Sequence, residues 1–468
     1  MACTIDATRA TKLGAGGIIF TDGRGAGKAR SAIGNMQMAI PRDPMQLLPE
    51  TKNTQVVMHG QDCRSYEKNH STTVCCLSDG HGELRGGAAY AFYACLIAPS
   101  LVLAEMHDIL SLTEAKDETG LGLLMDNLLK MLDYHLREEL VYTAGGGGGA
   151  TFTINIKYMH PRRAGVVCSL TSNIGDSPAF QIFNVRGQGR TLIETTRGYN
   201  ADNIDGFRQY AQECADSNLP IPEVIVSRWN LLGNFQAPWV SDESGRPKPI
   251  QVYQTSATDD GVVTVKIHPD MERFYKNSPP WFKSYFKFGG VQSHRDRAAN
   301  LAAQARGEYT PINFGCTVRN GTVQTLSSFG DIDSRKILGE APSSADTEMR
   351  PNRDWSHVLS THTTLRQITR PTVEFIMSDG VSDTMTDRDL VKCVDDVGTH
   401  SGILAQAVWE KMMTTARTLN DGTGTGKDKL FPMKDGQILW DDCSMWTQVI
   451  IPPRLKKSRG KGVRRERR

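Results

Sequence analysis

Two apolar runs, far apart in the chain, end in the same tripeptide, Ser-Asp-Gly. The first is TTVCCLSDG, with Asp79 at its end, and the second is VEFIMSDG, with Asp379 at its end. Both runs are too apolar for surface loops and predict buried strands. An ionised Asp at the end of a buried strand is costly unless a cation meets it. The fold therefore has to compensate these two charges.

Other acidic residues also stand at the ends of predicted strands. WDDCSMWTQVII places Asp441 and Asp442 before an apolar strand, and QDCRSY places Asp62 before another. If these acids converge they repel one another, and hard divalent cations, which prefer oxygen ligands, would remove that repulsion. The alternative is that they lie around the surface as separate turns, because Asp-Gly is a common hairpin dipeptide. The residues alone leave both interpretations open.

The order of predicted elements favours an α+β fold with antiparallel sheets covered by helices. Strands are expected at 54–66, 72–79, 151–159, 164–172, 179–185, 321–329, 373–379 and 443–451. Helices are expected at 84–97, where Pro99 ends the first, at 122–140, at 386–394 and at 401–419. Thr386 and Asp389 have the spacing of a capping box. This order lacks the regular alternation of a doubly wound sheet.

Three segments differ in composition. Residues 1–50 are rich in Gly and Ala and are expected to be an irregular extension, and residues 51–453 to form one domain with an insertion at about 200–310. Residues 454–468 form a basic tail with nine Lys and Arg against Glu466 as its one acid. Such a tail is either a solvated end, or a nuclear signal, or a contact for nucleic acid or an acidic partner.

The ten cysteines include no C-x-x-C pair, and Cys75 and Cys76 lie inside an apolar run. This pattern favours free thiols in a core and a reducing, intracellular setting, cytoplasmic or nuclear. No uninterrupted apolar run reaches about 18 residues, so no membrane span is expected. The sequence also argues against a zinc site.

Six segments resemble, in order, the motifs of the metal-dependent protein Ser/Thr phosphatases of type 2C. SDGHGE resembles their DGHGG signature, and SNIGDSPAF is similar to their GDSR element. The others are GGGGGATFTINIKY, RNGTVQTLSSFGDIDSRK, EFIMSDGVSDTMTDRDLV and DDCSMWTQVII, so the resemblance runs from about 55 to 451. It implies a four-layer α-β-β-α sandwich, two antiparallel sheets flanked by helices, with metals in a cleft at one edge.

The resemblance also implies roles for individual residues. Metal-ligand positions fall on Asp62, Asp79, Gly80, Asp379 and Asp441, and positions for a third, weaker ion fall on Asp176 and Asp383. The implied reaction is hydrolysis of phosphoserine and phosphothreonine on proteins by water activated by two Mn²⁺ or Mg²⁺ ions. His81 would protonate the leaving oxygen and act with Asp62 in catalysis; alternatively it is a turn histidine without that role.

The sequence departs from the family pattern at the substrate-gripping positions. Val57 stands where the family has Arg, Gln61 where it has Glu, and Pro178 where GDSR has its Arg. Arg64, on the same strand face as Asp62, is a conjectural substitute for the phosphate contact. Two functions are therefore open: a phosphatase acting on phosphoproteins, or a catalytically weak or inactive pseudophosphatase that serves as a binding or structural module.

Overall fold

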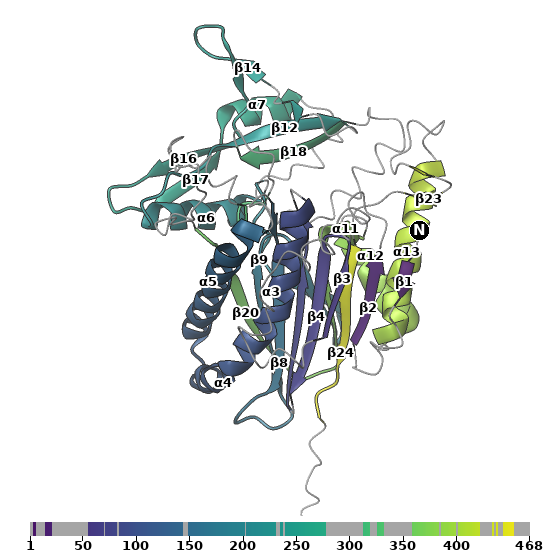
Figure 1. The fold of residues 1–468 in the computed structure, drawn as a ribbon. Coiled ribbons are helices and arrows are strands. Elements are labelled where there is room, and N and C mark those ends of the chain that lie inside the picture. Colours follow the sequence, from purple (N-terminus) through teal and green to yellow (C-terminus); the bar gives the residue numbers. More distant parts are fainter. Residues whose placement is uncertain are drawn as a thin grey trace, which may run out of the picture.

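The computed structural model describes residues 3–5, 15–20, 55–69, 71–81, 84–143, 148–201, 203–230, 235–236, 239–277, 312–318, 325–331, 358–382, 385–398, 401–421, 433–434, 437–438 and 443–453. Its centre is two antiparallel sheets of six strands each (Figure 1). The first sheet has the order β20-β9-β8-β5-β4-β3, spanning His362–Ile368, Val167–Ile174, Phe152–Met159, Thr72–Ser78, Asp62–Asn69 and Gln55–His59.

The second sheet has the order β1-β2-β24-β21-β10-β11. Its strands span Cys3–Ile5, Ala15–Phe20, Cys443–Ile450, Thr372–Met377, Ala179–Val185 and Gly189–Glu194. Residues 1–50 therefore contribute two strands, whereas the sequence predicted an irregular extension. The apolar AGGIIF pairs along its whole length with β24, and this pairing organises a segment whose composition alone predicts none.

Helices cover the outer face of each sheet. On the first sheet lie α3 (Leu84–Ala104), α4 (Met106–Ala115) and α5 (Glu118–Thr143), and on the second lie α12 (Asp387–Val397) and α13 (Ser401–Asp421) (Figure 1). The structure thus confirms the predicted sandwich of two antiparallel sheets flanked by helices. The capping box of α12 is also confirmed, since Thr386 and Asp389 bond to each other's backbone N–H groups.

Helix α3 continues through Pro99 to Ala104, so the prediction that Pro99 ends it was wrong. A proline inside a helix costs about 3 kcal/mol, and burial of Ala98 and Val102 on either side offsets this cost. Within α3, Gly86–Ala104 is long and apolar enough to cross a membrane by length and composition. Much of this segment packs in the core with α5 and the first sheet, and core helices satisfy the same criterion.

The space between the sheets holds both apolar and charged contacts. Tyr66, Leu77 and Trp446 pack there, and the indole N–H of Trp446 donates to the Cys76 carbonyl at 2.9 Å. In the same space, Lys157 of β8 forms an ion pair with Glu374 of β21. The nine cysteines whose side chains the structure describes are free and buried, and for Cys75 and Cys76 this confirms the predicted place in the core.

A separate hydrophobic cluster organises residues 199–277 and 312–318, which we call the inserted region because they fall largely within the predicted insertion at about 200–310. Tyr199, Phe207, Val226 and Met271 are among its buried members. Its elements are α6 (Ile204–Asp216), β12 (Val224–Asn230), β13 (Phe235–Gln236), β14 (Trp239–Ser241), β15 (Pro247–Pro249), β16 (Tyr253–Ala257), β17 (Val263–Ile267), α7 (Pro269–Asn277) and β18 (Ile312–Val318).

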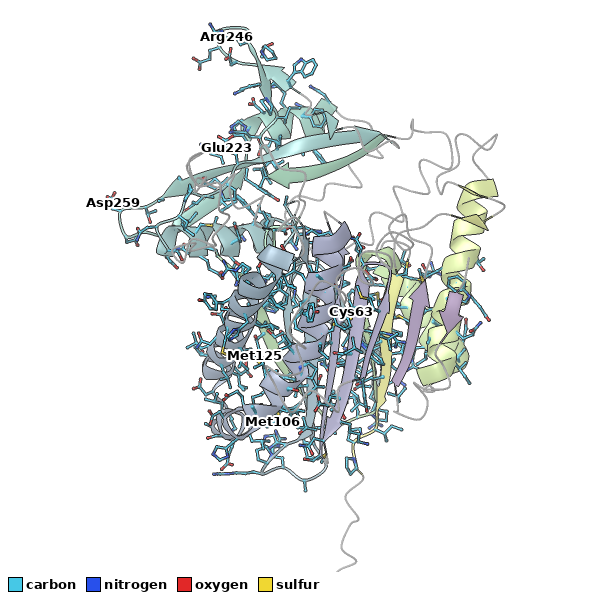
Figure 2. All side chains as sticks on the ribbon, in the orientation of Figure 1. Cys63, Met106, Met125, Glu223, Arg246 and Asp259 are labelled. Carbon is cyan, nitrogen blue, oxygen red and sulfur yellow. The ribbon has the colours of Figure 1, made fainter. Side chains whose placement is uncertain are left out.

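The inserted region stands beyond the same end of the sandwich as α11 (Asp379–Ser382) (Figure 1). In Figure 2 it carries the labelled Glu223, Arg246 and Asp259, with Arg246 and Asp259 at its outer tips, while Cys63 and Met125 mark the sandwich. Tyr199 ties the region to the sandwich, because its N–H donates to the Gly175 carbonyl at 3.0 Å. The two hairpins that carry Arg246 and Asp259 project away from the sheets (Figure 2).

Candidate active site

Asp62 and Asp79 lie where neighbouring strands of the first sheet begin and end. We call this end of the sandwich the site edge. Strand β5 ends at Ser78, which lies opposite Cys63 near the start of β4. Asp79 directly follows Ser78, and Asp62 directly precedes Cys63. The Asp62 side chain is fully buried, with 0% exposure, whereas Asp79 is half-buried. Two of the predicted acids therefore lie at the same end of neighbouring strands.

A short linker carries the chain from the first sheet to the second at the site edge. Strand β9 ends at Ile174, and β10 begins at Ala179 in the other sheet. Between them, the Pro178 carbonyl accepts the N–H of Met377 at 3.0 Å. Asp176 lies in this linker, 7% exposed, and Asp379 opens α11 shortly after Met377. The linker thus joins the edges of both sheets.

Thr151 holds the backbone of Asp79 in place. The Thr151 N–H donates to the Asp79 carbonyl at 2.8 Å, and the Asp79 N–H donates to the Thr151 hydroxyl at 3.3 Å. The same hydroxyl is hydrogen-bonded to that of Ser177 at 2.5 Å. One threonine therefore links the loop of Asp79 to the linker that carries Asp176.

Gly80 is required by close packing, since its neighbours leave no room for a side chain. A Cβ at this position would lie 2.5 Å from the Gly87 carbonyl oxygen and 2.8 Å from that of Gln61. The start of α3 and the turn before β4 therefore press against the Asp-Gly pair. This packing places Gln61, which precedes Asp62, beside Gly80.

His81 is the residue on which the charges of the site edge act. Its Nε2 lies 2.7 Å from Oδ2 of Asp331, and its side chain is 25% exposed. Burial favours the neutral imidazole, but the charge and hydrogen bond of Asp331, with the charges of Asp176 and Asp379, outweigh burial and raise the pKa of His81. Asp331 is thus in direct contact with this imidazole, whereas Asp176 and Asp379 act on it through their charges.

Oxygen donors at the site edge suit a hard divalent cation in kind. Asp62, Asp79, Asp176 and Asp379 supply carboxylates, and Gly80 supplies a backbone carbonyl. Within the part of the chain that the structure describes, however, His, Cys, Asp and Glu side chains form no group of three or more placed to hold a metal ion. Asp383 and Asp441 lie outside the described residues, although β24 begins at Cys443 beside the end of β21. A metal ion here therefore stays a prediction.

Arg64 lies between the two sheets. Its side chain is 2% exposed, and its guanidinium stands 4.5 Å from the centre of the Trp446 ring. This arrangement is a cation–π contact, and such burial does not support the conjectured contact with phosphate. Val57 pairs with Arg64 across β3 and β4, so an apolar residue lies beside this arginine.

Sequence reasoning gave Asp331 no role, although its segment, FGDIDSRK, belongs to one of the six resembling motifs. Strand β19 (Phe329–Gly330) pairs with β7 (Gly149–Ala150), which pairs with β6 (Gly80–His81). This three-stranded ribbon brings Asp331 to His81. The available signal was an Asp directly after Phe329 and Gly330, at the end of the predicted strand 321–329.

Comparisons with known proteins support a distant relationship at most. No protein-family model matches the chain, and no curated protein is similar to it in sequence. Among solved structures, a serine-threonine phosphatase 2C from Toxoplasma gondii is 13% identical, with a TM-score of 0.43, covering 93% of this chain and 95% of that one.

The Mycobacterium tuberculosis serine/threonine phosphatase PstP/Ppp is 11% identical, with a TM-score of 0.35, covering 86% of this chain and 97% of that one. The PstP catalytic domain in complex with two manganese ions is 10% identical, with a TM-score of 0.33, covering 85% and 96%. All three scores are below 0.5, so these similarities concern the general fold and carry no functional assignment.

Proposed function

We propose that this chain is a metal-dependent protein serine/threonine phosphatase whose active site is the site edge. One observation supports the proposal: Oδ2 of Asp331 lies 2.7 Å from Nε2 of His81, at the end of the sandwich where β5 leads into Asp79 and the β9–β10 linker carries Asp176. Acids and a histidine at strand ends are the residue types that metal-assisted hydrolysis uses.

The proposed cation ligands are Asp62, Asp79, Gly80, Asp379 and Asp441, with Asp176 and Asp383 for a further ion. When bound, Mn²⁺ or Mg²⁺ supplies positive charge for the phosphoryl oxygens and acidifies water. The chain's own part is to hold the ligand oxygens in place. The two hydrogen bonds between Thr151 and the backbone of Asp79 serve that purpose. His81 protonates the serine or threonine oxygen that leaves, so the product is a neutral hydroxyl.

The test is phosphate release from a phosphoserine peptide and from p-nitrophenyl phosphate, with and without MnCl₂. We expect manganese-dependent turnover by the wild type and a loss of at least about 100-fold in the Asp79→Ala/Asp379→Ala variant, because the charges that hold the cation are gone. The matched control is Asp205→Ala/Asp395→Ala, which removes two acids from exposed ion pairs and leaves turnover unchanged.

A second readout does not depend on turnover. MnCl₂ should raise the melting temperature of the wild type and of the control, because a ligand that binds only the folded state stabilises it. MnCl₂ should leave the melting temperature of the Asp79→Ala/Asp379→Ala variant unchanged. A wild type that neither turns over substrate nor responds to manganese would contradict the proposal.

A pseudophosphatase is the second candidate function, and the position of Arg64 favours it. Arg64 packs on Trp446, and Val57, Gln61 and Pro178 replace the family's charged residues. Under this alternative the fold serves as a binding or structural module. A folded wild type that binds manganese without hydrolysing either substrate would favour it.

A further inference from the structure

We infer that Asp331 is a positioning residue for the proposed reaction: its carboxylate holds Nε2 of His81 and leaves Nδ1 as the nitrogen that donates the proton. The inference rests on the proposed function and assigns a role to a residue outside the expected ligand set. The Asp331 side chain is 9% exposed, and its Oδ2 lies 2.7 Å from Nε2.

The ribbon of β6, β7 and β19 fixes this contact from the backbone. His81 and Gly330 both lie opposite Gly149, on its two sides. A Cβ on Gly149 would lie 2.6 Å from Cγ of Asp331 and 2.7 Å from its Oδ1. The absence of a side chain at Gly149 therefore gives the carboxylate room to reach across the ribbon to the imidazole.

Further hydrogen bonds hold the carboxylate and its backbone. The Asp331 N–H donates to the Gly148 carbonyl at 2.9 Å, and the Ser328 hydroxyl donates to Oδ2. Asp331 has a φ of 50°, in the left-handed region. This backbone conformation is unfavourable for a residue other than glycine and persists only where its surroundings determine it.

Helix α5 is hydrogen-bonded to the same turn. Asp133 of α5, 1% exposed, accepts the Gly330 N–H at 3.3 Å and forms an ion pair with Arg137 at 3.2 Å. The residue before Asp331 is thus attached to a helix of the sandwich. Such indirect support is what a side chain needs in order to hold a catalytic group within a fraction of an ångström.

The contact determines which proton moves. With Nε2–H directed to the carboxylate, the imidazolium gives its Nδ1–H proton to the seryl or threonyl oxygen as the P–O bond breaks. Water supplies the oxygen that completes inorganic phosphate and releases one proton to solvent, and the imidazole then takes up one proton from solvent, which restores Nδ1–H. The leaving group departs as an alcohol, and Nε2–H stays with Asp331 throughout.

The test compares two substrates in Asp331→Asn. A phosphoserine peptide has a basic leaving oxygen that needs the proton, whereas the nitrophenolate of p-nitrophenyl phosphate leaves without one. We expect kcat for the peptide to fall about 10- to 100-fold, part of the usual contribution of a general acid, and kcat for p-nitrophenyl phosphate to fall less than about threefold. KM for both should be unchanged, and Asp395→Asn is the matched control.

A double variant excludes a purely structural role. If Asp331 acts through His81, adding Asp331→Asn to His81→Ala should reduce peptide turnover no further. Equal losses on both substrates, or additive losses in the double variant, would overturn the inference while leaving the proposed function intact. No turnover by the wild type would overturn both.

A spectroscopic readout is independent of catalysis. In protein labelled with ¹⁵N-histidine, the His81 signals are identified by their loss in His81→Ala. We expect the wild type to show a protonated Nε2 and Asp331→Asn to shift both ring nitrogens. Ring signals that are the same with and without the carboxylate would also overturn the inference.

Discussion

Lys157 of β8 and Glu374 of β21 form an ion pair across the space between the two sheets, with side-chain exposures of 9% and 1%. Asn155, Ser169 and Gln181 donate to the other carboxylate oxygen, Oε1, at 3.2, 3.0 and 2.8 Å. Glu374 is therefore a buried charge compensated from both sheets. Removal of one partner leaves the other charge buried without its counterion.

We predict that Lys157→Met lowers the free energy of unfolding by about 3–5 kcal/mol, the usual cost of breaking a buried pair. Lys157→Met/Glu374→Gln should cost less than Lys157→Met alone, because the amide keeps an acceptor without a charge. Urea unfolding measures both. Arg190→Met, which breaks the more exposed pair with Asp395, is the control and should cost less than about 1 kcal/mol. A Lys157→Met cost as small as the control's would contradict the prediction.

Gly80→Ala should destabilise the fold by about 1–3 kcal/mol, the range for overpacking, because its Cβ meets backbone atoms of Gly87 and Gln61. Gly122→Ala in α5 is the matched control, since a Cβ there has no atom within 4 Å. Alanine is the better helix former, so the control should gain about 0.5–1 kcal/mol. Thermal unfolding of both variants measures this contrast, and equal effects would be inconsistent with tight packing at Gly80.

We predict that the free energy of unfolding falls in mild acid because of His362. Burial and then the charge of Arg197 lower its pKa from 6.5 to about 4. The unfolded state therefore binds more protons than the folded state between these values, so stability falls as the pH falls from about 6.5 to about 4. The contribution of His362 to this loss is on the order of 1–3 kcal/mol.

The measurement is urea unfolding at pH 7 and pH 5. His362→Gln should lose less stability between these two pH values than the wild type, because the group that takes up the proton is gone. The same substitution at His107, an exposed residue of α4, should lose as much as the wild type. If His362→Gln and the wild type lose equal stability, His362 is not the cause.

Much of the sandwich was predictable because its strands and helices have clear periodicity. Alternation or continuous apolar character marks β5, β8, β9 and β21, and the Thr386–Asp389 spacing marks the start of α12. The remaining errors come from contacts between distant segments. Pro99 is held inside α3 by packing, and β2 owes its place to β24. The predicted strand 321–329 is described only in part: Thr325 forms an isolated bridge and Phe329 begins β19.

The candidate site is only partly described by its acids. Strands β5 and β21 end shortly before Asp79 and Asp379, but the acids among the described residues form no group of three or more placed to hold a metal ion, so the predicted ligand set stays a prediction. The alternation along β4 predicts on which face of the sheet Arg64 lies, but not which residue packs against that face. In the structure Trp446 packs there, so the conjectured phosphate contact of Arg64 has no support. Asp331 was missed because its partner is set by pairing among three two-residue strands, which have no periodicity to detect.

His81 and Asp331 are separated by 250 residues, and the inserted region lies between them. During biosynthesis the ribosome therefore completes Asp79, His81 and most of the first sheet long before it adds the acid that orients the imidazole. A nascent chain, or a product of proteolysis that stops short of β19, has the first signature motif without this pair. The contact can form only late in synthesis, after the inserted region has been made.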